Sequence, residues 1–251
     1  MKANRFFMTA IFSIIGVLAA AQPWMMRPQG PANEFSALEG TSVLNYNLQM
    51  ERDIHSRAGF GPAFYIFPDS KLDNNQALEL AGKLDLVNII KEYGGRIMVV
   101  NPSSDKWQEQ DLENFRRLIG MGGSPTNVKV IGIGSGATFV NRHLAATDLT
   151  GVIAGIVSID GEPGKICKLP VPAFIGGKNA AKAAKPYQAT SDAAPADPLQ
   201  KVVVNTDKKA SLGTLFAEAW DEVLSANYRY NNLYRTFYMS RGIDNPEGVK
   251  N

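Results

Sequence analysis

The chain has 251 residues, of which 20% are charged, and its formal net charge is +2. This length is sufficient for one sizeable hydrophobic core. The nearly balanced charge gives no basis for nucleic-acid binding, which usually requires a clustered basic face. The single cysteine, Cys167, cannot form an internal disulfide. A local cluster of Lys178, Lys182 and Lys185 among alanines favours a solvated loop.

The first 21 residues have the features of an export signal. Lys2 and Arg5 precede an apolar run from Phe6 to Ala20, and Ala19-Ala20-Ala21 is a small-residue cleavage signature. The run is short for a membrane span. We therefore predict a signal peptide over residues 1–21, a secreted or periplasmic protein, and no stable membrane anchor after cleavage.

The next segment, residues 22–40, contains three prolines and is predicted to be an exposed lead-in. Beyond it, apolar runs alternate with segments of helical spacing. We expect strands at 41–48, 62–67, 96–100, 128–133, 151–159, 171–175 and 201–204. We expect helices at 75–93, 107–119, after the turn at 134–137, and at 212–226.

Alternating strands and helices indicate a mostly parallel central sheet with helices on both faces, which is an α/β three-layer sandwich. Residues 41–226 are predicted to form this single domain, and residues 227–251 a C-terminal tail.

The stretch Val128 to Ala145 is the centre of the prediction. A strand rich in β-branched residues meets the small-residue turn Gly134-Ser135-Gly136-Ala137, and a helical pattern follows. A serine between small residues at a sharp strand-to-helix turn is typical of a nucleophile elbow, which is usually spelled G-x-S-x-G. Ser135 is the candidate nucleophile.

With this elbow, the order of strands and turns resembles the secreted α/β-hydrolase esterases of the polyhydroxybutyrate-depolymerase and feruloyl-esterase type. The likeness covers roughly residues 60–225 and includes Pro62–Asp69, Gly94–Trp107, Ile133–Ala137 and Pro170–Asn179. The resemblance implies a serine nucleophile, a histidine base and an orienting carboxylate.

The resemblance also implies a pair of backbone donors for the oxyanion. By analogy, the Gly136 N–H is one donor, and the stretch Asp69-Ser70, with Ser70 as the candidate residue, supplies the other. The family has His-Gly where this chain has Pro68-Asp69. A carboxylate that pointed inward at this place would repel a developing oxyanion.

The base and the acid depart from the family pattern. His143 follows Ser135 by eight residues on the same helix, about 12 Å along the helix axis. His55 lies in the loop that leads into the strand at residue 62, so we expect it at the opposite end of the sheet. The loop after the last strand, residues 205–209, has no histidine. For the acid, Asp160 after the preceding strand is the available candidate, although the residues favour an ordinary turn residue over a catalytic acid.

Two functional interpretations follow from the residues. The chain is either an esterase acting on ester-bearing polymers or carbohydrate esters, with its base supplied from elsewhere, or a non-catalytic hydrolase-like domain that binds a ligand or partner. A serine without a base is a weak nucleophile, which favours the second interpretation. Residues 132–137 also fit the dinucleotide pattern G-x-G-x-x-A, but the first acid after it, Asp160, comes late. We expect no cofactor and no metal.

Overall fold

The computed structural model describes residues 33–38, 41–46, 63–93, 96–121, 128–149, 153–169, 171–192 and 201–225. All of them belong to one compact unit. The predicted signal peptide, His55 and the predicted tail over residues 227–251 lie outside these ranges.

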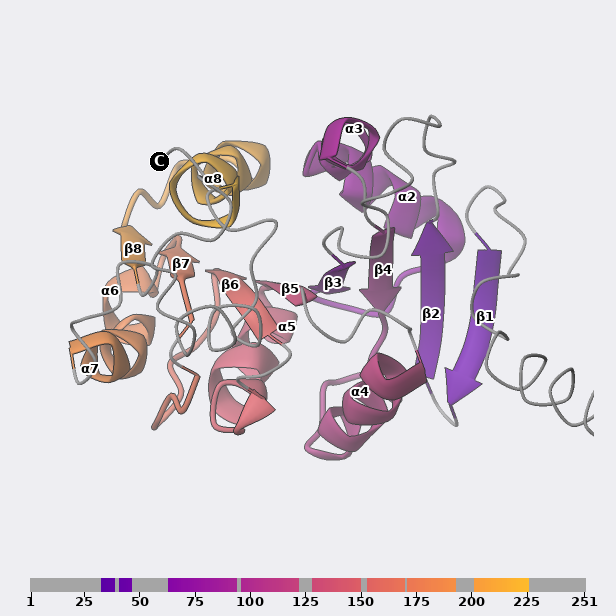
Figure 1. Ribbon diagram of the computed structural model, residues 1–251, viewed down its shortest axis with the longest axis horizontal. Helices are drawn as coiled ribbons and strands as arrows, with labels where there is room; N and C mark the ends of the chain where they lie inside the picture. Colours follow the sequence, from indigo (N-terminus) through magenta and orange to yellow (C-terminus); the bar gives the residue numbers. More distant parts are fainter. Residues whose placement is uncertain are drawn as a thin grey trace, which may run out of the picture. The chain divides into compact units, whose positions relative to one another are not determined.

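In the described part of the chain, eight strands form one sheet in the order β1-β2-β4-β3-β5-β6-β7-β8 (Figure 1). β1 and β2 are antiparallel, and the strands from β4 to β8 in this order are parallel to one another. The strands are β1 (Asn33–Leu38), β2 (Thr41–Tyr46), β3 (Ala63–Phe67), β4 (Arg96–Val100), β5 (Val128–Ile133), β6 (Ile153–Ile159), β7 (Ala173–Gly176) and β8 (Val202–Asn205).

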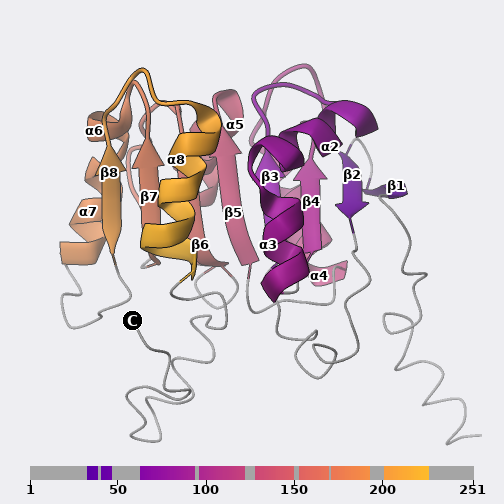
Figure 2. The ribbon, with the colours of Figure 1, turned by 90° about the horizontal axis from the view of Figure 1, so that it is seen from above.

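Helices cover both faces of this sheet (Figure 2). One face packs against α2 (Asn74–Lys83), α3 (Leu86–Tyr93), α8 (Leu212–Ala219) and its π-helical continuation η4 (Trp220–Leu224). The other face packs against α4 (Gln110–Met121), α5 (Ser135–Phe139), its π-helical continuation η2 (Val140–Leu144), α6 (Ala180–Ala183) and α7 (Lys185–Asp192). Within the described ranges, no helix is both long enough and apolar enough to cross a membrane.

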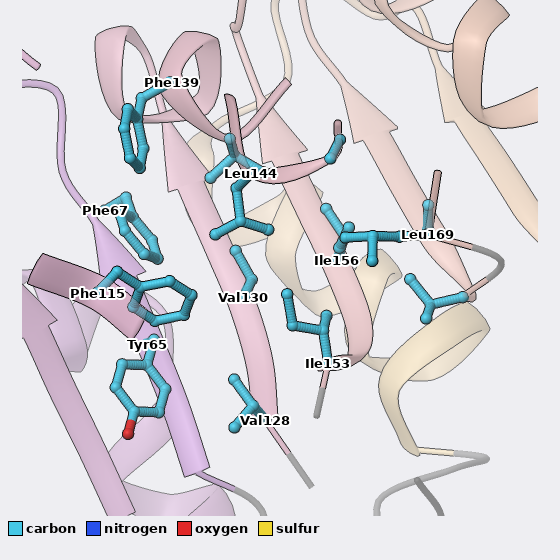
Figure 3. Close-up of a cluster of buried hydrophobic side chains, with 14 of the residues drawn as sticks. Tyr65, Phe67, Phe115, Val128, Val130, Phe139, Leu144, Ile153, Ile156 and Leu169 are labelled. Carbon is cyan, nitrogen blue, oxygen red and sulfur yellow. The ribbon is translucent and has the colours of Figure 1, made fainter. Parts of the chain in front are cut away.

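This architecture confirms the predicted fold class, an α/β-hydrolase-like sandwich of three layers. Every residue of β3 and β6 is buried, because helices cover both sides of these central strands. The core beside β3 is aromatic: the Phe67 ring lies 5.0 Å from Phe115 and 5.6 Å from Phe139, between centroids (Figure 3).

Four local expectations differ from the structure. The predicted lead-in contains a strand, β1, which pairs with β2. The helix predicted over 75–93 is broken by Asp85, which has a φ of 53° and whose carboxylate accepts a hydrogen bond from the Asn88 side-chain amide at 2.6 Å. Asp tolerates this conformation better than most residues do.

The other two differences concern loops. Trp107 precedes α4 instead of lying in it, because the buried Asp111 carboxylate accepts the Gln108 N–H at 2.8 Å and the helix begins there. The solvated loop predicted at the lysine cluster is helical, since Lys182 lies in α6 and Lys185 opens α7, although both side chains are exposed.

Lys129 is a charged residue inside the core. It lies on β5 and is fully buried. Its aliphatic chain passes close to Gly155 of the neighbouring strand β6, where a Cβ at residue 155 would lie 3.5 Å from the Lys129 Cδ. Burial lowers the pKa of the Lys129 ammonium well below its ordinary value of 10.5.

Because the pKa of Lys129 is lower in the folded protein, protonation favours the unfolded chain, and the resulting loss of stability decreases as the pH rises toward 10.5. Lys129→Met removes this titrating group. We therefore predict that the free energy of unfolding of Lys129→Met, relative to that of the natural protein, is lower at pH 10 than at pH 7. Urea unfolding of both proteins at the two pH values measures this difference. The exposed Lys165→Met is the control, and an equal difference at pH 7 and pH 10 in Lys129→Met would contradict the prediction.

Candidate functional site

The order of the strands determines where the sheet opens. β3 and β5 are neighbours, yet the chain leaves β3 toward α2 on one face and leaves β5 toward α5 on the other. In open α/β sheets, ligands bind at such a switch point, outside the carboxyl ends of the strands. The residues there are Asp69, which follows β3, and the turn that begins at Gly134.

The sharp strand-to-helix turn is present, and it confirms the predicted elbow geometry. Its strained residue is Gly134, with φ of 57° and ψ of −118°, a combination that is nearly restricted to glycine. Ser135 is the first residue of α5. The prediction that Ser135 stands at the apex is therefore wrong by one residue.

Two further glycines show the register of the turn. A Cβ at residue 132 would lie 2.6 Å from the Ala137 Cα, and one at residue 136 would lie under 3.0 Å from the Phe67 carbonyl oxygen. In the G-x-S-x-G elbow, the outer glycines permit this close packing and the nucleophile stands between them. The stretch in this chain is G-x-G-x-G, with Gly134 in the central place. That spacing was the signal in the sequence that could have identified the apex.

Asp69 lies against this turn. The Ser135 N–H donates to the Asp69 Oδ1 at 2.6 Å, and the Ser135 hydroxyl donates to the Asp69 backbone carbonyl. The residue after the apex supplies an oxyanion donor in an elbow of this kind. With Gly134 at the apex, that residue is Ser135, and its N–H already has a carboxylate partner. The role of Gly136 as an oxyanion donor stays a prediction. Ser70 is exposed, one residue beyond Asp69.

The segment that carries Asp69 is anchored at both ends by the loop after β4. The Trp107 indole N–H donates to the Pro68 carbonyl at 2.9 Å. Further along, the Leu72 N–H donates to the Asn101 side chain at 3.0 Å, and the Asn101 amide donates back to the Leu72 carbonyl at 2.7 Å. The position of Asp69 is thus specified by neighbours on two sides.

Asp160 ends β6, beside the turn, because the Gly134 N–H donates to the Ile159 carbonyl at 2.9 Å. Its φ is 58°, and its carboxylate accepts the Lys178 N–H at 2.9 Å. Asp160 therefore joins the ends of β6 and β7. The described structure gives it no histidine to orient, so its predicted role as the acid stays a prediction.

Of the two histidines, His55 lies outside the described residues, and the structure gives His143 no hydrogen bond to Ser135. His143 lies in η2, where its ring is 5.5 Å from that of Phe139, between centroids. The loop after β8 is organised by Asn205, whose side chain accepts the Asp207 N–H at 2.8 Å. Among the described residues, no group of three or more His, Cys, Asp or Glu side chains could hold a metal ion.

No protein-family model and no curated protein matches the sequence. Among solved structures, the chain is similar to MGS-M1, an α/β hydrolase from a Medee basin deep-sea metagenome library. The identity is 15%, the match covers 86% of this chain and 98% of that one, and the TM-score is 0.50.

Two other structures match with lower TM-scores. A protein described as a dienelactone hydrolase from Klebsiella pneumoniae subsp. pneumoniae has 11% identity, covers 77% of this chain and 96% of its own, and has a TM-score of 0.48. Est1E from Butyrivibrio proteoclasticus has 12% identity, and the match covers 77% of this chain and 97% of Est1E, with a TM-score of 0.49. At 15% identity, the likeness to MGS-M1 concerns the fold alone, which is like that of an α/β hydrolase.

The geometry of the turn predicts that Gly134→Ala decreases the free energy of unfolding by roughly 1–3 kcal/mol, because a Cβ is strained at this φ and meets Asp69. Gly82→Ala is the matched control. Gly82 lies in α2 with nothing within 4 Å of an added Cβ, so that change should stabilise by about 0.5–1 kcal/mol. Chemical denaturation compares the two, and equal effects would contradict the assigned strain.

Proposed function

We propose that the chain is an exported α/β-hydrolase-fold protein that binds a ligand at the carboxyl edge of its sheet without cleaving it. The glycine at the apex of the turn is the observation that supports this proposal most. A residue without a side chain supplies no nucleophile, and covalent catalysis of ester cleavage requires one.

The environment of Ser135 supports the same proposal. Its hydroxyl donates to a backbone carbonyl, so no general base accepts that proton. Its N–H donates to the Asp69 carboxylate, so a negative charge already occupies the place where an oxyanion would need stabilisation. A developing oxyanion would be repelled there.

The proposed ligand is an ester-bearing polymer or a carbohydrate ester, following the resemblance of the sequence. Hydroxyl and carboxylate groups at the edge, on Ser70, Asp69 and Asp160, are exposed and can hydrogen-bond a polyhydroxylated ligand. The proposal of export rests on residues 1–21, whose composition is that of a signal peptide.

We expect the mature protein to show no labelling by a fluorophosphonate probe and no turnover of short p-nitrophenyl esters. Oligomers of 3-hydroxybutyrate or acetylated xylo-oligosaccharides should bind and be recovered intact. Mass spectrometry of the probe-treated protein, a chromogenic ester assay and isothermal titration calorimetry measure these outcomes.

Ser135→Ala separates the two functional interpretations. Labelling or turnover that is present in the natural protein and lost in this variant would establish Ser135 as a nucleophile and reject the non-catalytic proposal. Intact ligands with no binding heat would reject the proposed ligand class.

Export predicts that the secreted or periplasmic protein begins at Gln22. The cleavage signature Ala19-Ala20-Ala21 accounts for that position. N-terminal sequencing of the protein from the culture medium or the periplasmic fraction tests it. Ala21→Lys should block cleavage, and a protein that retains Met1 in the natural sequence would contradict export by this signal.

A further inference from the structure

The space beside Gly134 is already filled from another strand. An ideal Cβ placed on residue 134 would come closer than 3.0 Å to the Oδ1, Cγ and Cβ atoms of Asp69. Real Cβ atoms essentially never approach other atoms so closely. The Asp69 side chain thus occupies the volume that the side chain of an elbow nucleophile would need.

The contact between Asp69 and the turn lies at the protein surface, because both Asp69 and Ser135 are exposed. Asp69 is bound through two different groups: its carboxylate accepts the Ser135 N–H, and its backbone carbonyl accepts the Ser135 hydroxyl. A hydrogen bond to an ionised carboxylate is stronger than a neutral one.

The backbone around Asp69 opposes its withdrawal. Pro68 is held by the Trp107 indole, and Leu72 is held on both backbone groups by Asn101. Only three residues lie between these two anchors. Trp107 in turn stacks on Phe139 of the elbow helix, with 4.8 Å between ring centroids, so the anchor and the turn belong to one packed unit.

We propose that the Asp69 side chain blocks access to the apex of the turn at residue 134, and that residues 69 and 134 are coupled occupants of one volume. A side chain at position 134 requires the removal of the side chain at position 69. This inference goes beyond the proposed function, because it concerns access to the turn and holds whether or not a ligand binds.

The alkylation rate of a cysteine placed at position 134 measures access to the turn. This reaction needs no general base from the protein. The variants are Gly134→Cys alone, with Asp69→Asn, and with Asp69→Gly. Each is treated with iodoacetamide at pH 8, and peptide mass spectrometry separates residue 134 from the buried Cys167. Ser70→Cys gives the rate for an exposed thiol.

Gly134→Cys with Asp69→Gly is expected to react at least ten times faster than Gly134→Cys alone and close to the Ser70→Cys rate. Asn has nearly the same volume as Asp without the charge, so the Asn variant should stay slow. Equal rates in the three variants would overturn the proposal. A fast Asn variant would also overturn it, because charge and not volume would then control access.

A second measurement applies if the cysteine variants are poorly folded. Thermal unfolding of Asp69→Gly, Gly134→Ser and the double variant forms a double-mutant cycle. We expect the double variant to have a higher Tm than the sum of the two single losses predicts. Additive losses would overturn the coupling. Neither readout depends on esterase activity or ligand binding, so a failure here is distinct from a failure of the proposed function.

Discussion

The hydrogen bond from the Ser135 N–H to the Asp69 carboxylate joins the two strands that meet at the switch point of the sheet. β3 and β5 send the chain to opposite faces of the sheet, and in open α/β sheets ligands bind at such a switch point. The contact lies at this switch point, and the neighbouring loops are arranged around it. Trp107 and Asn101 from the loop after β4 hold the segment, and the glycine at residue 134 gives it room.

The glycines that flank the turn are required by packing, independently of any catalytic chemistry. Gly132 and Gly136 are required by close packing against Ala137 and Phe67, whatever residue stands between them. These glycines therefore report on the fold and not on catalysis, which depends on the groups grafted onto it. The same distinction holds for Asp160, whose carboxylate joins two strand ends and needs no catalytic role to account for its conformation.

Left-handed backbone is concentrated at the carboxyl edge. Gly134, Asp160 and Gly177 follow β5, β6 and β7 in turn, and all three have positive φ. Strain of this kind persists where surrounding contacts specify it, and it gathers at functional sites. The contacts between the strand ends thus hold the loops of this edge in one arrangement.

The sequence by itself determined the fold class and most of the parallel strands, because strands buried on both faces have nearly continuous apolar runs. β4 and β5 match their predicted bounds. It also determined that the loop after β8 has no histidine. Helix boundaries that single side chains set were less visible, such as the break at Asp85 within the predicted long helix and the start of α4 at Asp111.

Only the tertiary structure decided which residue stands at the apex of the turn and what fills the space beside it. Serine is the expected nucleophile, so the pattern drew attention to Ser135, whereas the strained φ belongs to Gly134. Asp69 is 66 positions away from Ser135 in the chain. No local pattern records a contact over that separation, because it exists only once β3 and β5 are paired.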